Sequence, residues 1–127
     1  MIPTLMIVED DEELHELYTA MLEPLDCRLV RAYGGEEALR RLEEAEPDLM
    51  ILDILLGRMT GDAVFRRLRQ APRWRDLPVV IVSVLAEARC RERLEMDERA
   101  VFLRKPFHKE QLLAAVQRGL EMNKRKE

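Results

Sequence analysis

Residues 47–53 have the sequence Pro-Asp-Leu-Met-Ile-Leu-Asp, and this stretch decides the fold. Its four consecutive apolar residues, Leu49 to Leu52, are enclosed by acids. A short, continuous apolar run of this kind is typical of a strand buried on both faces, as in a parallel sheet covered by helices. Further strand candidates lie at residues 5–8, 28–32, 79–82 and 101–103.

Amphipathic stretches separate these strands. From Asp11 to about Met21, the apolar residues Leu14, Leu17, Tyr18 and Met21 recur at spacings of three and four, which predicts a helix. The same spacing predicts helices around residues 38–42, 64–68 and 112–120, and a helix over 86–95 with Leu94 as its clearest apolar contact. Strict alternation of five strands and five helices predicts an α/β fold, with a parallel sheet and helices on both faces.

Composition limits the classes of function. The chain has 127 residues, enough for one domain over residues 1–122 and a polar tail at 123–127. Charged residues make up 36% with a net charge of -4, which argues against nucleic-acid binding. No apolar run approaches the roughly 20 residues that span a membrane. Cys27 and Cys90 form no CxxC motif, so a reduced, cytoplasmic protein is expected.

Polar residues follow the predicted strands where ligands bind in open parallel sheets. Glu9 and Asp10 follow the first strand, Asp53 the third and Ser83 the fourth, and Lys105 comes after the fifth. Because the carboxyl ends of parallel strands meet at one edge, these groups are expected to converge if the strands are neighbours.

Such a set has a definite chemistry. Clustered carboxylates repel one another unless a cation lies among them, and all-oxygen ligands suit Mg²⁺. Lys105 and Ser83 would stabilise a phosphoryl group, and Asp53 could act as a nucleophile that forms an acyl phosphate. Taken singly these are weak signals, because Asp10 or Asp11 could cap a helix and Lys105-Pro106 is a common turn dipeptide. Their combination at strand ends is the stronger signal.

In order and spacing, these segments resemble the receiver domain of two-component response regulators, the family of the bacterial chemotaxis regulator. The matching segments are residues 5–11, 47–53, Gly61, residues 77–83 and residues 105–107. The resemblance implies a flavodoxin-like, doubly wound fold with strand order 2-1-3-4-5. It also implies that residues 1–122 form a phospho-accepting signalling switch without a turnover substrate.

The resemblance implies a role for each matching residue. Asp53 would accept a phosphoryl group from the phosphohistidine of a sensor histidine kinase or phosphotransfer protein. Glu9, Asp10, Asp53 and the backbone carbonyl of Leu55 would bind Mg²⁺. Lys105 would pair with a phosphoryl oxygen.

The family also implies a response to phosphorylation. Ser83 would move to bond the phosphoryl group, and Phe102 falls where the family has an aromatic switch residue. The face made by the fourth helix, fifth strand and fifth helix would then change and control a downstream protein or effector domain. A homodimer through the fourth and fifth helices is left open.

Some positions depart from the family pattern. Gly57 stands where proline is usual, Val84 follows Ser83 where alanine or glycine is usual, and residues 95–100 lack the usual Gly-Ala pair. These departures keep open the alternative of a degenerate receiver, a phosphorylation-independent interaction module. A phosphoaspartyl hydrolase is disfavoured, because the acid expected two residues after the nucleophile is Leu55.

Apolar Leu55 and Leu85 are expected to flank the phosphoryl group and to give a long-lived phospho-Asp53. His15 and His108 lie away from strand ends and are expected to be ordinary surface residues. Cys27 and Cys90 are expected to be packing or partly exposed thiols.

Overall fold

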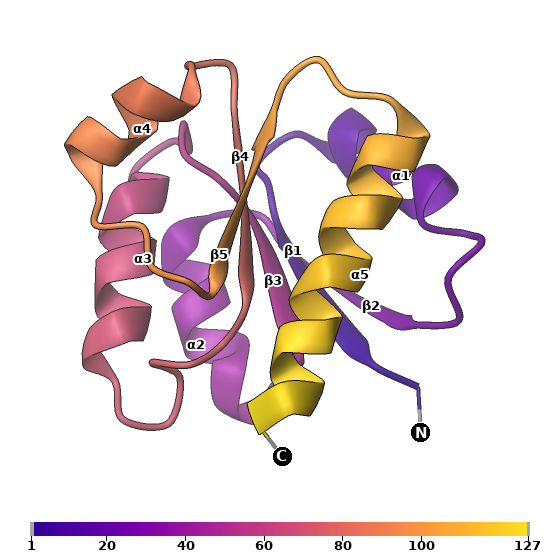
Figure 1. Ribbon diagram of the computed structural model, residues 1–127, viewed down its shortest axis with the longest axis horizontal. Helices are drawn as coiled ribbons and strands as arrows, with labels where there is room; N and C mark the ends of the chain where they lie inside the picture. The colour runs from indigo at the N-terminus through magenta and orange to yellow at the C-terminus, as the bar shows by residue number, and fades with distance from the viewer. Residues whose placement is uncertain (1, 127) are drawn as a thin grey trace.

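A computed structural model describes residues 2–126. Strands and helices alternate along the chain without exception in the described part (Figure 1). The elements are β1 Thr4–Val8, α1 Glu12–Met21, β2 Arg28–Ala32, α2 Gly35–Ala45, β3 Leu49–Asp53, α3 Gly61–Gln70, β4 Val79–Ser83, α4 Glu87–Arg93, β5 Ala100–Arg104 and α5 Lys109–Lys126.

The five strands form one parallel sheet in the order β2-β1-β3-β4-β5, as predicted. Helices α1 and α5 cover one face, and α2, α3 and α4 cover the other (Figure 1). The order reverses between β1 and β3, the strands that end just before Glu9 and at Asp53. Ligands of doubly wound sheets bind at such a reversal, so the topology itself points to this edge.

Alternating residues of each strand supply two separate cores. Met6 and Val8 face the cluster under α2, α3 and α4, while Leu5 and Ile7 face the cluster under α1 and α5. Because both faces of the inner strands β1, β3 and β4 are covered, successive positions there carry apolar side chains, which explains the continuous runs in the sequence.

Helix α1 forms where the spacing of its apolar residues predicts a helix. Of the four residues that carry that spacing, Tyr18 is buried and Leu14 and Met21 pack against the core, but Leu17 is 47% exposed. His15 and the C-cap residue Leu22 are also buried and follow a spacing of three and four with Tyr18. The buried face of α1 is therefore wider than the apolar residues alone indicate, because it includes a histidine.

Helix α4 is shorter than predicted. It covers only Glu87–Arg93, and Leu94 is its extended C-cap residue. Leu94 is buried, but Cys90 is the buried residue within the helix itself. Cys90 therefore supplies the helix's main anchor to the core, and the predicted boundaries at residues 86 and 95 are wrong.

Arg69 of α3 fastens the segment between α4 and β5. Its Nε atom donates to Asp97 Oδ2 at 2.6 Å and its Nη1 atom donates to the Leu77 carbonyl at 2.8 Å. Its guanidinium carbon also lies 4.6 Å from the centre of the Phe65 ring. The segment that lacks the family's Gly-Ala pair is thus tied to α3.

Helix α5 continues to Lys126. The expected polar tail at residues 123–127 is therefore helical up to Lys126, and Glu127 lies outside the described residues. Within residues 2–126, no helix has the length and apolar content required to cross a membrane.

Candidate functional site

The carboxyl edge of the sheet brings Asp53, Glu9 and Lys105 together. Lys105 Nζ lies 2.5 Å from Asp53 Oδ2 and 3.8 Å from Glu9 Oε1. The Lys105 N–H also donates to the Ser83 carbonyl at 2.8 Å, which extends the β4–β5 pairing past the end of β5. An ammonium group thus lies between two carboxylates that would otherwise repel each other.

Asp53 is nearly buried, with 6% of its surface exposed. Its Oδ1 atom accepts the Leu55 N–H at 2.8 Å, and its Oδ2 atom contacts Lys105. The Leu55 side chain points outward and is 49% exposed. One oxygen of the Asp53 carboxylate is therefore bound by a backbone N–H and the other by the Lys105 cation. The exposed side chain next to Asp53, that of Leu55, is apolar.

Gly61 fits closely against the backbone at Asp53. A Cβ atom at this position would lie 2.3 Å from the Asp53 carbonyl oxygen and 2.6 Å from Ile54 Cα. The Gly61 N–H donates to the Ile54 carbonyl at 2.8 Å, which closes the loop after β3. Gly57 is under no such constraint, because its Cβ would meet only Asp10 Oδ2 at 3.7 Å.

Glu9 is 3% exposed, and one of its carboxylate oxygens accepts no hydrogen bond. Its Oε2 atom accepts the Asp11 N–H at 3.1 Å, whereas its Oε1 atom is buried without a hydrogen bond. The pKa of Glu9 is raised from 4.5 to about 7, mainly by burial and also by the neighbouring Asp10 and Asp53 side chains. The Asp11 N–H and the Lys105 charge oppose that increase.

The raised pKa of Glu9 predicts a pH dependence of stability in metal-free protein. The native state binds more protons than the unfolded state between the ordinary pKa of 4.5 and the native pKa of about 7. The free energy of unfolding should therefore decrease as pH rises through this window, by about 2 kcal/mol from this group.

Urea denaturation in EDTA, between about pH 5 and pH 8, measures this change. Glu9→Gln should flatten the pH profile, whereas Glu13→Gln, an exposed control on α1, should leave it unchanged. An unaltered profile in the Glu9→Gln protein would contradict the prediction.

The other expected site residues lie around this cluster. Asp10 is exposed beside the loop at Gly57. Ser83 is fully buried at the end of β4, and its Oγ atom accepts the Leu85 N–H at 3.0 Å. Phe102 is half-buried in β5, opposite Ile81 of β4, and packs against the core under α4.

The oxygen donors of this edge fit a hard cation such as Mg²⁺. Within residues 2–126, no three His, Cys, Asp or Glu side chains are gathered into a preformed ligand cluster. However, the buried Glu9 Oε1 atom lacks a hydrogen-bond partner, and the Asp10 carboxylate is exposed next to it. Mg²⁺ usually keeps several waters and takes only one or two protein carboxylates, so this incomplete set is suitable.

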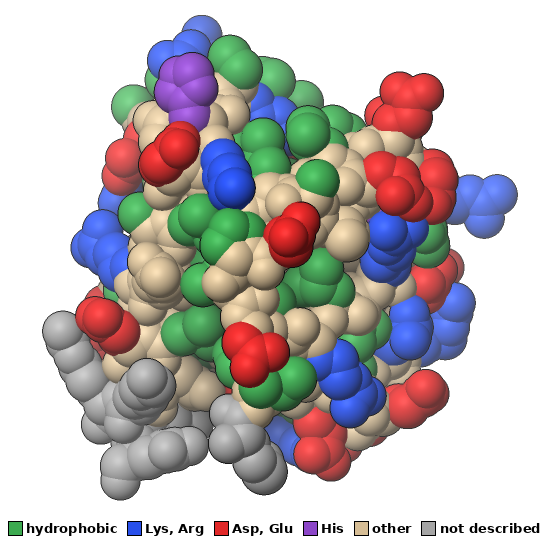
Figure 2. All heavy atoms as spheres, turned by 90° about the vertical axis from the view of Figure 1, so that its right-hand side faces the viewer, with side chains coloured by type: hydrophobic (Ala, Val, Ile, Leu, Met, Phe, Trp, Pro, Cys, Tyr) green, Lys and Arg blue, Asp and Glu red, His purple; other side chains and the backbone are tan. Residues whose placement is uncertain are grey.

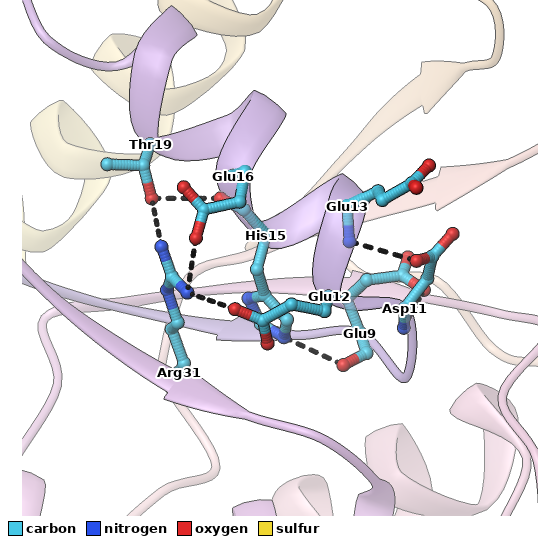
Figure 3. A network of polar contacts seen from close by, with 8 residues as sticks. All are labelled: Glu9, Asp11, Glu12, Glu13, His15, Glu16, Thr19 and Arg31. Atoms are coloured by element: carbon cyan, nitrogen blue, oxygen red, sulfur yellow. Dashed lines mark hydrogen bonds and ion pairs between the residues drawn. The ribbon is translucent and has the colours of Figure 1, made fainter.

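His15 is not a surface residue, contrary to the expectation from sequence. It is fully buried, its Nε2 atom lies 2.7 Å from the Glu9 carbonyl oxygen, and its ring lies 4.5 Å from that of Tyr33 (Figure 3). Its spacing from Tyr18 and Leu22 was the signal that could have revealed the burial.

His108 is exposed, as predicted, while Cys27 is half-buried and Cys90 buried, both as free thiols.

The sequence profile of the response regulator receiver domain matches residues 5–117. The chain belongs to this family. The receiver domain is 35% identical to the phosphate regulon transcriptional regulatory protein PhoB of Rhizobium meliloti (strain 1021), over 98% of this chain and 55% of PhoB. It is 31% identical to the polar-differentiation response regulator DivK of Brucella ovis, over 84% of this chain and 87% of DivK.

Solved receiver domains have the same fold. The signal receiver domain of a signal transduction histidine kinase from Syntrophus aciditrophicus is 32% identical, with a TM-score of 0.84, and the match covers 94% of this chain and 90% of that one. The receiver domain spans only a small part of some relatives, such as 8% of hybrid signal transduction histidine kinase D of Dictyostelium discoideum.

An apolar groove begins beside the receiver domain's Lys105 and follows α1. It has a volume of about 340 Å³ and is lined by Leu14, Leu17, Met21, Val84, Lys105 and Phe107, among others. Figure 2 shows hydrophobic side chains gathered between charged ones on this side of the molecule. Val84 is 53% exposed, so it forms part of the groove wall rather than filling the core.

Proposed function

We propose that this receiver domain is a phospho-accepting switch of a two-component phosphorelay. Its donor is the phosphohistidine of a sensor histidine kinase or phosphotransfer protein in the cytoplasm, and its acceptor is Asp53. The contact between Lys105 Nζ and Asp53 Oδ2 at 2.5 Å is the observation that supports this most directly. It places a cation on a nearly buried carboxylate at the sheet edge where ligands bind.

Transfer needs a carboxylate oxygen of Asp53 to form the new bond to phosphorus. The phosphorus–nitrogen bond of the phosphohistidine breaks, and the imidazole keeps the electron pair. The Leu55 N–H holds the Oδ1 atom during this exchange, and Lys105 is placed to pair with an oxygen of the arriving group. The product is an acyl phosphate on Asp53.

The proposed magnesium ligands are Glu9, Asp10, Asp53 and the carbonyl of Leu55. When bound there, the ion supplies positive charge that offsets the charge on the phosphoryl oxygens. The carboxylates of the site then need less neutralisation from Lys105, which becomes available to the phosphoryl group.

The domain acts as a switch and has no turnover substrate. Ser83 and Phe102 are the proposed relay, since Ser83 ends β4 next to the site and Phe102 lies on the neighbouring strand β5. Phosphorylation would shift the face of α4, β5 and α5 toward a form that binds a downstream protein or effector domain.

The apolar groove along α1 suits the donor protein. Because Asp53 is nearly buried, a phosphohistidine reaches it only if its carrier packs closely against this edge. The groove continues from Lys105 toward Met21, so an apolar helix lying along α1 would bring its histidine to the site.

Beryllofluoride, which mimics a phosphoryl group on aspartate, tests the proposed function. With Mg²⁺ present, it should shift the amide resonances of Leu55, Ser83 and Lys105, and EDTA should reverse the shifts. A spectrum that does not respond would instead support a phosphorylation-independent interaction module. The single tryptophan, Trp74, lies in the α3–β4 connection away from the site, so its fluorescence is a poor substitute.

Phospho-Asp53 is expected to hydrolyse slowly, because the exposed side chain next to it, that of Leu55, is apolar. Leu55 offers no polar atom to orient an attacking water, whereas asparagine at this position would. Leu55→Asn should therefore speed hydrolysis by about 10-fold, less than the roughly 100-fold or more of a general base, because an amide orients the water without taking its proton. Decay of label after acetyl phosphate treatment measures the rate, and Leu55→Met is the apolar control. Equal decay rates for all three proteins would contradict the expectation.

A further inference from the structure

The imidazole of His15 lies directly beneath the turn that carries Glu9 and Asp10. Its Nε2 atom is 2.7 Å from the Glu9 carbonyl oxygen (Figure 3), and the His15 side chain is fully buried. A carbonyl oxygen can only accept, so Nε2 carries the hydrogen and donates it. The Nδ1 atom is buried without a hydrogen-bond partner, so the contact with Glu9 is the side chain's polar anchor.

The position of the His15 ring is set by groups around it. The Tyr33 ring packs against it at 4.5 Å with a tilt of 53°. Beside it, Arg31 Nη1 donates to Glu12 at 2.9 Å and to Glu16 at 3.2 Å, which holds α1 against β2 (Figure 3). The imidazole therefore packs on the Tyr33 ring within a helix that is tied to the sheet, and it points at one backbone atom.

That backbone atom controls where Asp10 points. The Glu9 carbonyl and the Asp10 N–H belong to one planar peptide unit, so fixing the first orients the second. Glu9 is otherwise held through its N–H to the Ala32 carbonyl at 3.0 Å and through its Oε2 atom to the Asp11 N–H. Of these contacts, the hydrogen bond from His15 is the one made to the peptide unit that joins the two acids.

We propose that His15 is a positioning residue for the magnesium site, acting through the Glu9–Asp10 peptide. This inference rests on the proposed function, because it concerns the same two acids. Groups that orient metal ligands from behind commonly change metal affinity by 10- to 100-fold when removed. Loss of the His15 donor should act in this way without removing any ligand.

His15→Phe is the first test, because phenylalanine keeps a ring against Tyr33 and removes the donor. Titration of Mg²⁺, followed by amide chemical shifts, should give a dissociation constant about 10-fold higher than in the unmodified protein. Thermal unfolding in EDTA separately reports any loss of stability. An affinity for Mg²⁺ within about twofold of the unmodified protein would overturn the proposal and leave His15 as a core residue only.

A second pair of variants covers the case in which His15→Phe does not fold. Glutamine and methionine have similar shapes, but only glutamine carries an N–H donor. The His15→Gln protein should bind Mg²⁺ more tightly than the His15→Met protein, and equal affinities would overturn the proposal. Leu22→Ala, at the buried C-cap residue of α1, is the stability control and should lower the melting temperature without changing Mg²⁺ affinity.

The unmodified protein separates this inference from the proposed function. If it fails to bind Mg²⁺, the proposed function fails and the role of His15 fails with it. If it binds Mg²⁺ and the His15 variants bind equally well, only the role of His15 is overturned.

Discussion

Replacement of Asp53 by asparagine is expected to reduce phosphoryl incorporation from acetyl phosphate to background. The amide would retain the shape of the side chain, which is 6% exposed, and an oxygen for the Leu55 N–H. It would lack the anionic oxygen that forms the bond to phosphorus. The contact with Lys105 would also lose its opposite charge. Intact-protein mass measurement after incubation with acetyl phosphate and Mg²⁺ measures the incorporation.

Asp48→Asn is the matched control for this experiment. Asp48 precedes the opposite end of β3, where its carboxylate accepts the Thr4 N–H at 2.8 Å. The Asp48→Asn substitution also converts a hydrogen-bonded carboxylate into an amide, but at the end of the sheet opposite Asp53. The Asp48→Asn protein should therefore be labelled at the unmodified rate. Persistent labelling of the Asp53→Asn protein would mean that another residue is the acceptor.

The second large effect concerns stability. Gly61→Ala should lower the free energy of unfolding by about 3 kcal/mol, the upper part of the usual range for overpacking. The added Cβ would lie 2.3 Å from the Asp53 carbonyl oxygen and 2.6 Å from Ile54 Cα. Both are backbone atoms, which cannot move away by a rotamer change as a flexible side chain can. Relief would require the loop after β3 to move, and the acceptor would move with it.

Urea denaturation of the Gly61→Ala protein measures this loss, and Gly34→Ala is its control. A Cβ at Gly34 would meet nothing within 4 Å. Alanine there should change the free energy of unfolding by less than about 1 kcal/mol, because the restriction of the unfolded chain offsets the loss of glycine at the N-cap of α2. If the two variants proved equally stable, the close approach at Gly61 would carry no energetic cost.

The sheet could be predicted almost to the residue from sequence. Continuous runs such as Leu49–Leu52 leave no alternative to a strand covered on both faces, and β3 differs from its prediction only by including Asp53. Helices were harder, because an amphipathic period fixes the spacing of the buried residues but not the width of the buried face. In α1 the predicted residues Leu14, Tyr18 and Met21 do pack against the core, but the burial of His15 beside them depends on its contacts with Tyr33 and Glu9.

The site residues that could be predicted from sequence are the polar residues that directly follow the predicted strands. The contacts of Asp53 and Glu9 with Lys105 correspond to the convergence expected at the sheet edge. Neither the Glu9 oxygen that accepts no hydrogen bond nor the carbonyl contact of His15 has a signature in local sequence, because each depends on atoms brought together by folding. Helix α4 was predicted too long, with Leu94 as its core contact, for a related reason: the burial of Cys90 within the helix depends on packing brought about by folding.

The Arg69 contacts bear on how the protein moves. An exposed ion pair in isolation contributes little, since water replaces either partner readily. Arg69, however, joins Asp97, the Leu77 carbonyl and the Phe65 ring through one rigid group. When one contact breaks, the others keep the guanidinium in place long enough for the first to form again. Release of the segment before β5 then becomes a rare, concerted event rather than continuous fraying. A segment that is released as a unit would suit the proposed switch better than one that loosens gradually.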